Sequence, residues 1–146
     1  MTLCLFCLLI GVGVVQAQES EHQSFKKNSI ELFLGGTYAD SETDPSIGLA
    51  YERRLNEKLG LGGIVEYTRS DEWVLAVPLY FHAAEPWKFF VVPGVEIEDE
   101  GESFLIRVGA AYEFEFQGWS LAPELSMDYV DDDVKVVFGL NFGVSF

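Results

Sequence analysis

The residues that could do chemistry in this sequence are charged side chains that recur within otherwise apolar stretches. Successive side chains of an extended strand point to opposite faces, so charges spaced by two share a face. Sorted in this way, the charges of one polar face are Glu31, Glu52, Arg54, Glu66, His82, Lys88, Glu96, Arg107, Glu113, Glu115, Glu124, Asp128 and Lys135. Buried charges must be paired or neutralised, which predicts a salt-bridge network. Because acids outnumber cations on this face, the alternative is a water path that favours cations, with some acids protonated or hydrated.

A nucleophilic catalytic site is the second chemistry to weigh. His82 shares the polar face with several glutamates and with Ser120 or Ser126, and Ser/His/Glu sets occur in phospholipases and lipid A deacylases. Such a set needs hydrogen-bond contact among its three groups. His82 falls near one strand end and Ser126 in the opposite half, and no catalytic motif surrounds them. The sequence therefore predicts no catalytic residue, no enzyme activity and no cofactor.

Acidic clusters in the connecting segments are the third candidate. Their carboxylates suit Ca²⁺ or Mg²⁺, or contact with lipopolysaccharide through such ions. The residues concerned are Asp99, Glu100, Asp131, Asp132 and Asp133. The ordered spacing of a calcium loop is missing, so solvated acidic loops remain the favoured interpretation and a metal site stays undecided.

Strands must position these side chains, because no window of the sequence has helical spacing. The clearest strand is 134–146, where apolar residues alternate and the last residue is Phe146. The strands expected are 29–38, 46–55, 59–68, 73–83, 87–97, 104–116, 119–130 and 134–146. Their lengths suit tilted bilayer-crossing strands, which need about 9–11 residues. We predict an all-β fold: an eight-stranded antiparallel up-and-down transmembrane β-barrel over residues 29–146.

The connections and the aromatic residues orient this barrel. Odd-numbered connections are acidic and even-numbered ones are tight turns, which predicts outer loops, periplasmic turns and periplasmic termini. Aromatic side chains gather at strand ends, as in the girdles at both interfaces of membrane barrels. The girdle residues expected are Tyr38, Tyr67, Trp73, Trp87, Phe116, Trp119, Tyr129 and Phe146.

Two features bear on the barrel wall. The polar face carries glycine and alanine among its charges, which fits a narrow polar lumen better than the solvent face of a soluble lipocalin-like binder. Pro78, Pro93 and Pro123 fall within expected strands, where each removes a ladder donor. We expect bulges there, with shifts in the alternation of the side chains that follow.

The beginning of the sequence reads as a targeting segment. Residues 1–17 are apolar and close on small residues, as in a cleaved signal peptide. Residues 18–28 would then form a polar periplasmic tail. Both cysteines, Cys4 and Cys7, lie in the apolar segment, so no disulfide or thiolate site is expected in the mature chain. The net charge of −15 argues against nucleic acid as a partner.

Taken together, residues 29–146 resemble the small eight-stranded outer-membrane barrels, the superfamily of OmpX-like proteins and OmpA-type membrane domains. No family-specific motif is matched, so no functional residue is carried over. The resemblance implies a location in the outer membrane, contact with lipid and lipopolysaccharide, and recognition of the C-terminal strand by the barrel-assembly machinery. We expect a monomer with a plugged polar lumen and a structural or accessory role. A narrow cation or small-solute channel, a lipid-modifying enzyme and a soluble lipocalin-like binder are the alternatives.

Overall fold

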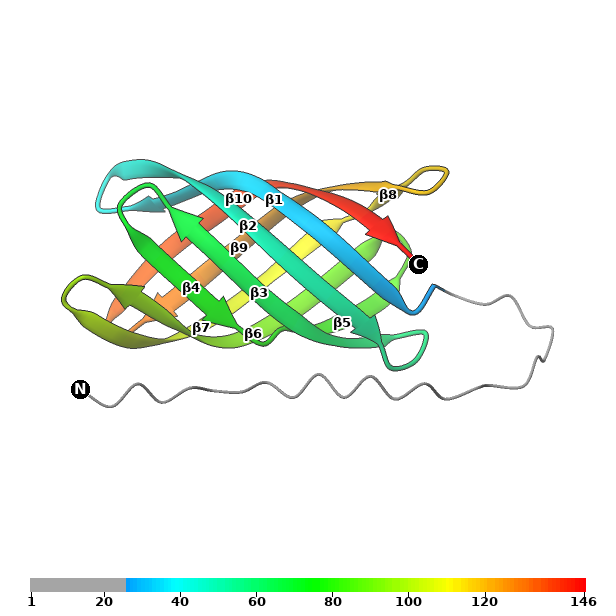
Figure 1. Cartoon of the computed structure of the whole chain (residues 1–146), viewed down its shortest axis with the longest axis horizontal. Coiled ribbons are helices and arrows are strands. Elements are labelled where there is room, and N and C mark those ends of the chain that lie inside the picture. Colours follow the sequence, from blue (N-terminus) through cyan, green and yellow to red (C-terminus); the bar gives the residue numbers. More distant parts are fainter. Residues whose placement is uncertain (1–25) are drawn as a thin grey trace.

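The computed structural model describes residues 26–146, so the predicted signal peptide and most of the predicted tail lie outside the described residues. Every regular element in this range is a strand (Figure 1). The strands are β1 (Asn28–Ala39), β2 (Glu42–Arg54), β3 (Leu59–Thr68), β4 (Glu72–Ala76), β5 (Leu79–Ala84), β6 (Trp87–Glu98), β7 (Gly101–Tyr112), β8 (Phe114–Glu115), β9 (Ser120–Val130) and β10 (Asp133–Ser145). In the described part of the chain, no helix is long and apolar enough to cross a membrane.

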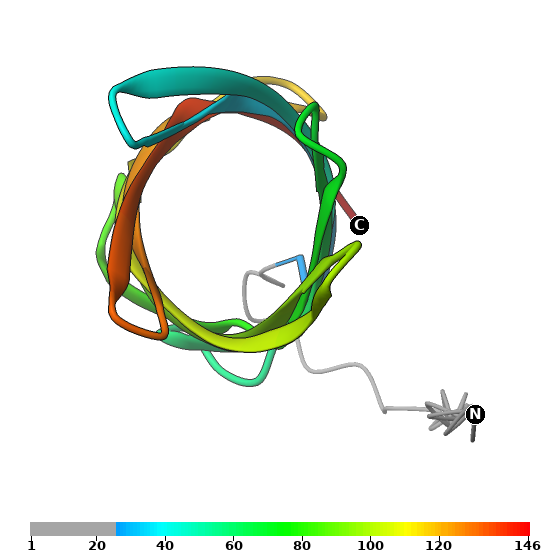
Figure 2. The same cartoon turned by 90° about the vertical axis from the view of Figure 1, so that its left-hand side faces the viewer.

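The strands form a closed antiparallel barrel. Consecutive strands pair, when β4 with β5 and β7 with β8 are each counted as one strand, and β1 also pairs with β10, from Ser29 opposite Ser145 to Tyr38 opposite Val136. Figure 2 shows the resulting ring from one end. β4 and β5 are two segments of one strand, as are β7 and β8, so the barrel has eight strands. The predicted fold class is confirmed.

The two ends of the barrel differ. Both ends of the described chain, at Lys26 and Phe146, lie at one end, which we call the terminal end (Figure 1). The connections after β1, β3, β6 and β9 lie at the other, which we call the acidic end. Here β2 begins at Glu42 and β7 at Gly101, earlier than expected, so two predicted acidic loops shrink to two-residue turns. In the first turn Asp40 and Ser41 have φ of 50° and 69°. Positive φ at both residues is typical of a type I′ turn, whose twist matches that of the flanking strands.

Prediction at the prolines was wrong. Bulges were expected at Pro78, Pro93 and Pro123, yet side chains keep alternating through all three. Pro78 interrupts the strand between β4 and β5, but the pairing of both segments with β3 and β6 stays in one register. The register shift on this strand lies between His82 and Ala84 instead.

Two prolines nevertheless weaken one strip of the wall. The Val77 amide donates to the carbonyl of Pro93 at 2.9 Å, and the Gly62 amide donates to the carbonyl of Pro78 at 3.1 Å. Because proline has no N–H, neither bond has the reciprocal partner that antiparallel pairs normally exchange. At two adjacent positions in this part of the wall, between β3 and β5 and between β4 and β6, the strands are therefore joined by one hydrogen bond instead of two.

The outer surface is apolar. Alternate residues of every long strand expose large apolar side chains, for example Leu125 at 60 % and Leu49 at 56 %. Aromatic rings mark the strand ends. Phe116 stacks on Trp119 with centroids 4.2 Å apart at the terminal end, and Tyr67 contacts Trp73 at 4.9 Å at the acidic end. All of the expected girdle residues lie on this outer surface, at least partly exposed.

Candidate functional site: the charged barrel interior

Lys88 of β6 organises the charges near the terminal end. Its side chain is 2 % exposed, and its Nζ donates to Glu31 at 2.5 Å. Glu113 and Glu52 lie 3.6 and 4.0 Å from the same nitrogen, and the ring of Tyr80 lies below it with its centroid at 5.1 Å. One ammonium group thus contacts several carboxylates. Because Lys88 is buried, at least one of these carboxylates must stay ionised to balance its charge.

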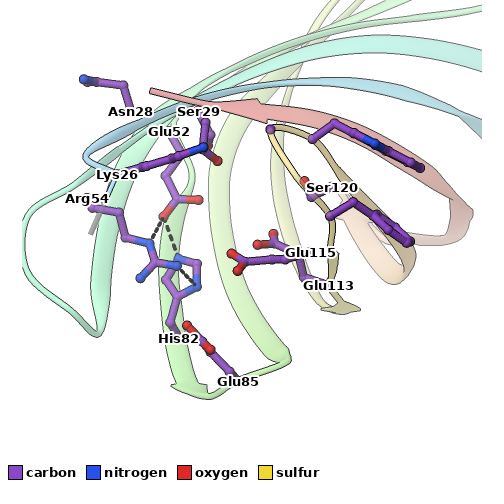
Figure 3. Close-up of a pocket in the computed structure, with 14 residues that line it drawn as sticks. Lys26, Asn28, Ser29, Glu52, Arg54, His82, Glu85, Glu113, Glu115 and Ser120 are labelled. Atoms are coloured by element: carbon purple, nitrogen blue, oxygen red, sulfur yellow. Dashed lines mark hydrogen bonds and ion pairs between the residues drawn. The ribbon is translucent and has the colours of Figure 1, made fainter. Parts of the chain in front are cut away.

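His82 lies beside this group and is fully engaged (Figure 3). Arg54 Nη2 lies 2.9 Å from His82 Nδ1, and His82 Nε2 lies 2.6 Å from Glu52 Oε1. An arginine nitrogen can only donate, so Nδ1 accepts and the Nε2 proton is donated to the glutamate. The imidazole has no free nitrogen with which to activate a nucleophile. Among the described residues no hydrogen bond joins His82 to Ser120 or Ser126.

Arg107 of β7 dominates the middle of the barrel. Its Nε and Nη2 donate to the two oxygens of Asp128 at 2.6 and 2.8 Å. Its Nη1 donates to Glu66 Oε2 at 2.7 Å. All three residues are at most 3 % exposed. The bidentate bond to Asp128 belongs to the strongest class of charged hydrogen bond in proteins, and Glu66 adds a second carboxylate.

Apolar side chains also enter the middle of the barrel, although none was predicted there. A Cβ atom added to Gly139 would lie 2.6 Å from the ring of Phe33. A Cβ atom added to Gly109 would lie equally close to the ring of Phe90. Glycine on the neighbouring strand therefore makes room for each ring. The other buried apolar residues of the interior include Val74, Ala76, Tyr80, Val92, Leu105, Ala111, Ala122, Val130 and Val137.

Lys135 of β10 lies inside the acidic end. Its Nζ donates to Glu96 at 2.7 Å and to Glu72 at 3.2 Å. Carboxylate oxygens of Glu72, Glu96 and Glu98 lie within 4.8 Å of one another. Glu72 was expected in a loop, although its position next to the outward-facing Trp73 could have placed it on the inner face. The ammonium group of Lys135 contacts two of the three acids, and its single charge balances one of them.

The acidic turn residues surround this group without joining it. Asp99 and Glu100 form the turn after β6, Asp131 and Asp132 the turn after β9, and Asp133 begins β10. All five are exposed. Their predicted contact with cations or lipopolysaccharide stays a prediction.

Each end of the barrel has a polar cavity, and the middle is almost filled. Adjoining cavities of about 250 and 300 Å³ lie at the terminal end, where Glu115 is exposed on their lining. A cavity of about 320 Å³ lies at the acidic end. The described interior between them has a cavity of about 20 Å³, beside Glu124, whose Oε2 accepts from Asn141 Nδ2 at 2.5 Å. That volume accommodates about one water molecule.

No protein-family model matches the chain, and no curated protein matches its sequence. Solved structures do match its fold. A designed transmembrane β-barrel superposes with a TM-score of 0.57 at 16 % identity, covering 84 % of this chain and 98 % of that one. Ail, the attachment invasion locus protein of Yersinia pestis, gives 0.58 at 12 % identity, over 83 % and 99 %.

The N-terminal β-barrel domain of OprF from Pseudomonas aeruginosa gives a TM-score of 0.57 at 15 % identity, over 84 % of this chain and all of that domain. These similarities confirm the predicted resemblance to small outer-membrane barrels, at the level of the fold. Ail is an outer membrane protein, which agrees with the predicted location. The three structures share too little sequence for any residue role to be transferred.

Proposed function

We propose that this chain is an outer-membrane barrel with a structural or accessory, non-catalytic role, and that its lumen is closed to solutes. The observation that supports this is the small volume, about 20 Å³, between the cavities at the two ends. A hydrated ion needs a continuous water path, whereas here aromatic rings and short ion pairs occupy the cross-section. In this proposal the terminal end faces the periplasm and the acidic end faces outward, as alternation of tight and acidic connections suggests.

Single-channel recording in a planar lipid bilayer tests this proposal. The purified protein should give no stepwise current above the bare bilayer. As a positive control, the double variant Phe33→Ala, Phe90→Ala removes the two interior phenylalanine rings and should produce small steps. Stepwise currents from the unaltered protein would refute the closed lumen.

A narrow cation path is the second candidate, because one observation favours it. The cavity at the acidic end is lined by Glu72, Glu96, Glu98 and Asp131 with Lys135 as its cation, and such a lining attracts cations. The same recording distinguishes the two functions. Steps whose reversal potential follows the cation gradient would support the path.

The partners we propose are lipid, lipopolysaccharide and the barrel-assembly machinery, with the barrel as a monomer. Phe146 is 61 % exposed beside the strand that closes the barrel, so a receptor for the C-terminal strand could reach it before closure. Deleting Phe146 should lower the amount of protein assembled in the outer membrane, with Phe146→Tyr as the matched control. Equal assembly of the deletion and the control would refute this recognition.

A further inference from the structure

The exposed cations of this acidic chain are gathered at the terminal end of the barrel. Five basic side chains of residues 26–146 are exposed, and the four at the terminal end are Lys26, Lys27, Arg53 and Lys58. The fifth, Arg69, is at the acidic end. Lys26 lies on the lining of a terminal-end cavity. The other three, which we call the basic corner, lie just before β1 and on the hairpin between β2 and β3.

Arg53 belongs to the outer, apolar surface of the barrel. It is the last residue but one of β2 and lies opposite Asn28 of β1 and Leu61 of β3. Among the outward-facing positions of the described strands, it is the one that carries a basic side chain. Tyr51 and Leu55, on the same face of the chain, are exposed on either side of it. Its methylene groups can therefore lie on apolar surface while the guanidinium reaches the headgroup region.

The basic corner keeps an excess of positive charge. None of its three residues takes part in a salt bridge within residues 26–146. Glu57, in the same turn as Lys58, is the exposed acid that lies beside them. The other exposed acids at this end, Glu85 and Glu115, line the terminal-end cavities. Three cations and one acid leave the corner with two net positive charges.

A neutral hydrogen-bond donor accompanies these cations. The hydroxyl of Tyr51 donates to Asn28 Oδ1 at 2.8 Å, which leaves the amide nitrogen of Asn28 as a donor. Asn28 is the residue directly opposite Arg53 in the sheet. An amide N–H beside a guanidinium suits a negatively charged oxygen, because charge-assisted hydrogen bonds are the strong ones. The leucines next to Arg53 present apolar surface to the same ligand.

We propose that the basic corner binds the phosphate headgroup of an anionic phospholipid, whose acyl chains lie along Leu55, Leu59 and Leu61. Charge complementarity favours this occupant, because basic side chains clustered at a membrane surface attract anionic lipids. Lipopolysaccharide fits less well, since the proposed orientation places the terminal end at the periplasmic leaflet, which consists of phospholipids. The inference rests on that orientation, and it deepens the proposed contact with lipid by naming the residues and the headgroup class.

An NMR titration of the barrel in uncharged maltoside micelles tests the proposal. Short-chain phosphatidylglycerol is added in one arm and short-chain phosphatidylcholine in the other, and the amide signals of residues 27, 53 and 58 are followed. Each net positive charge near an anionic lipid adds about fivefold to binding. With two such charges, phosphatidylglycerol should bind about 25-fold more tightly than phosphatidylcholine. Raising the salt concentration should lower this ratio, because exposed charges are screened.

Charge-removing variants locate the site. Arg53→Gln should lower the ratio about fivefold. Arg69→Gln, which removes an exposed cation at the acidic end, is the matched control and should leave the ratio unchanged. The double variant Arg53→Gln, Lys58→Gln removes both net charges and should bring the ratio to about one.

Equal binding of the two lipids to the unaltered protein would overturn the proposal. A preference that persists in the double variant would also overturn it, because the anionic lipid would then bind elsewhere. A third arm uses lipopolysaccharide: signals of residues 27, 53 and 58 that respond to it but not to phosphatidylglycerol would refute the inference together with the orientation. Channel recordings are a separate measurement, so failure of the lipid site and failure of the closed lumen can be told apart.

Discussion

Removing the guanidinium of Arg107 should be the most damaging single change in the interior. Arg107→Met keeps most of the side-chain length but removes three charged hydrogen bonds of 2.6 to 2.8 Å. It also leaves Asp128 and Glu66, which are 2 % and 3 % exposed, without a cation in contact. Breaking one buried ion pair costs about 3–5 kcal/mol. Because two carboxylates lose their partner here, we expect a loss near the upper end, about 5 kcal/mol.

The loss can be measured by reversible urea unfolding of the barrel in lipid vesicles, followed by tryptophan fluorescence. Arg69→Met, on an exposed connection, is the matched control and should leave the unfolding free energy almost unchanged. The triple variant Arg107→Met, Asp128→Asn, Glu66→Gln removes all three charges together. It should regain most of the loss, because neutral replacement of a whole buried charge group is often tolerated.

Two results would refute this reasoning. A loss of less than about 1 kcal/mol for Arg107→Met would mean that water in the interior solvates both acids, in the way that it solvates the charges of ion pairs on a protein surface. A triple variant as unstable as the single one would mean that Arg107 acts through packing rather than through charge.

Three further predictions use the same unfolding assay. Leu125→Arg places a charge on the lipid face near the middle of β9 and should cost about 2–4 kcal/mol; a negligible cost would contradict a transmembrane position. Gly139→Ala should cost about 1–3 kcal/mol by overpacking, because the added Cβ would meet the backbone of Leu34 and Gly35 as well as the ring of Phe33; the added variant Phe33→Leu relieves only the ring contact and should recover a minor part of the cost. Pro93→Ala restores a donor for the Val77 carbonyl and should stabilise the barrel by about 1 kcal/mol, whereas a loss would show that the proline itself is favoured there.

Most of the fold prediction rested on the alternation of apolar and polar side chains along each strand. Side chains of a strand have a period of two, so the pattern of 134–146 could be extended to every strand without knowing the pairing. The strand ends at the acidic end were less predictable. A two-residue turn such as Asp40–Ser41 requires positive φ values, and a run of acidic residues does not show in the sequence whether it forms such a turn or a longer loop. The prolines misled the prediction because a single missing N–H is absorbed without a register change.

The interior was only partly predictable. Which charges face inward follows from alternation, but which acid meets which cation depends on strand register and shear. Alternation also places Phe33 and Phe90 on the inner face, two residues after Glu31 and Lys88, but the glycine that makes room for each ring depends on strand register. Among the described residues Glu66 Oε1 has no hydrogen-bond partner, and this could not be foreseen from the sequence because it depends on Arg107 reaching the other oxygen.

The pairing of β1 with β10 has a consequence for how the chain folds. All other pairings join strands that follow each other, so they can form as local hairpins during or soon after insertion. The closing seam joins segments near the two ends of the described chain and has by far the greatest contact order, which slows its formation. Until it forms, the sheet carries two unpaired edges, each able to recruit another strand. The slowest step in acquiring the native barrel should therefore be the closing of this seam, and aggregation should compete with that step.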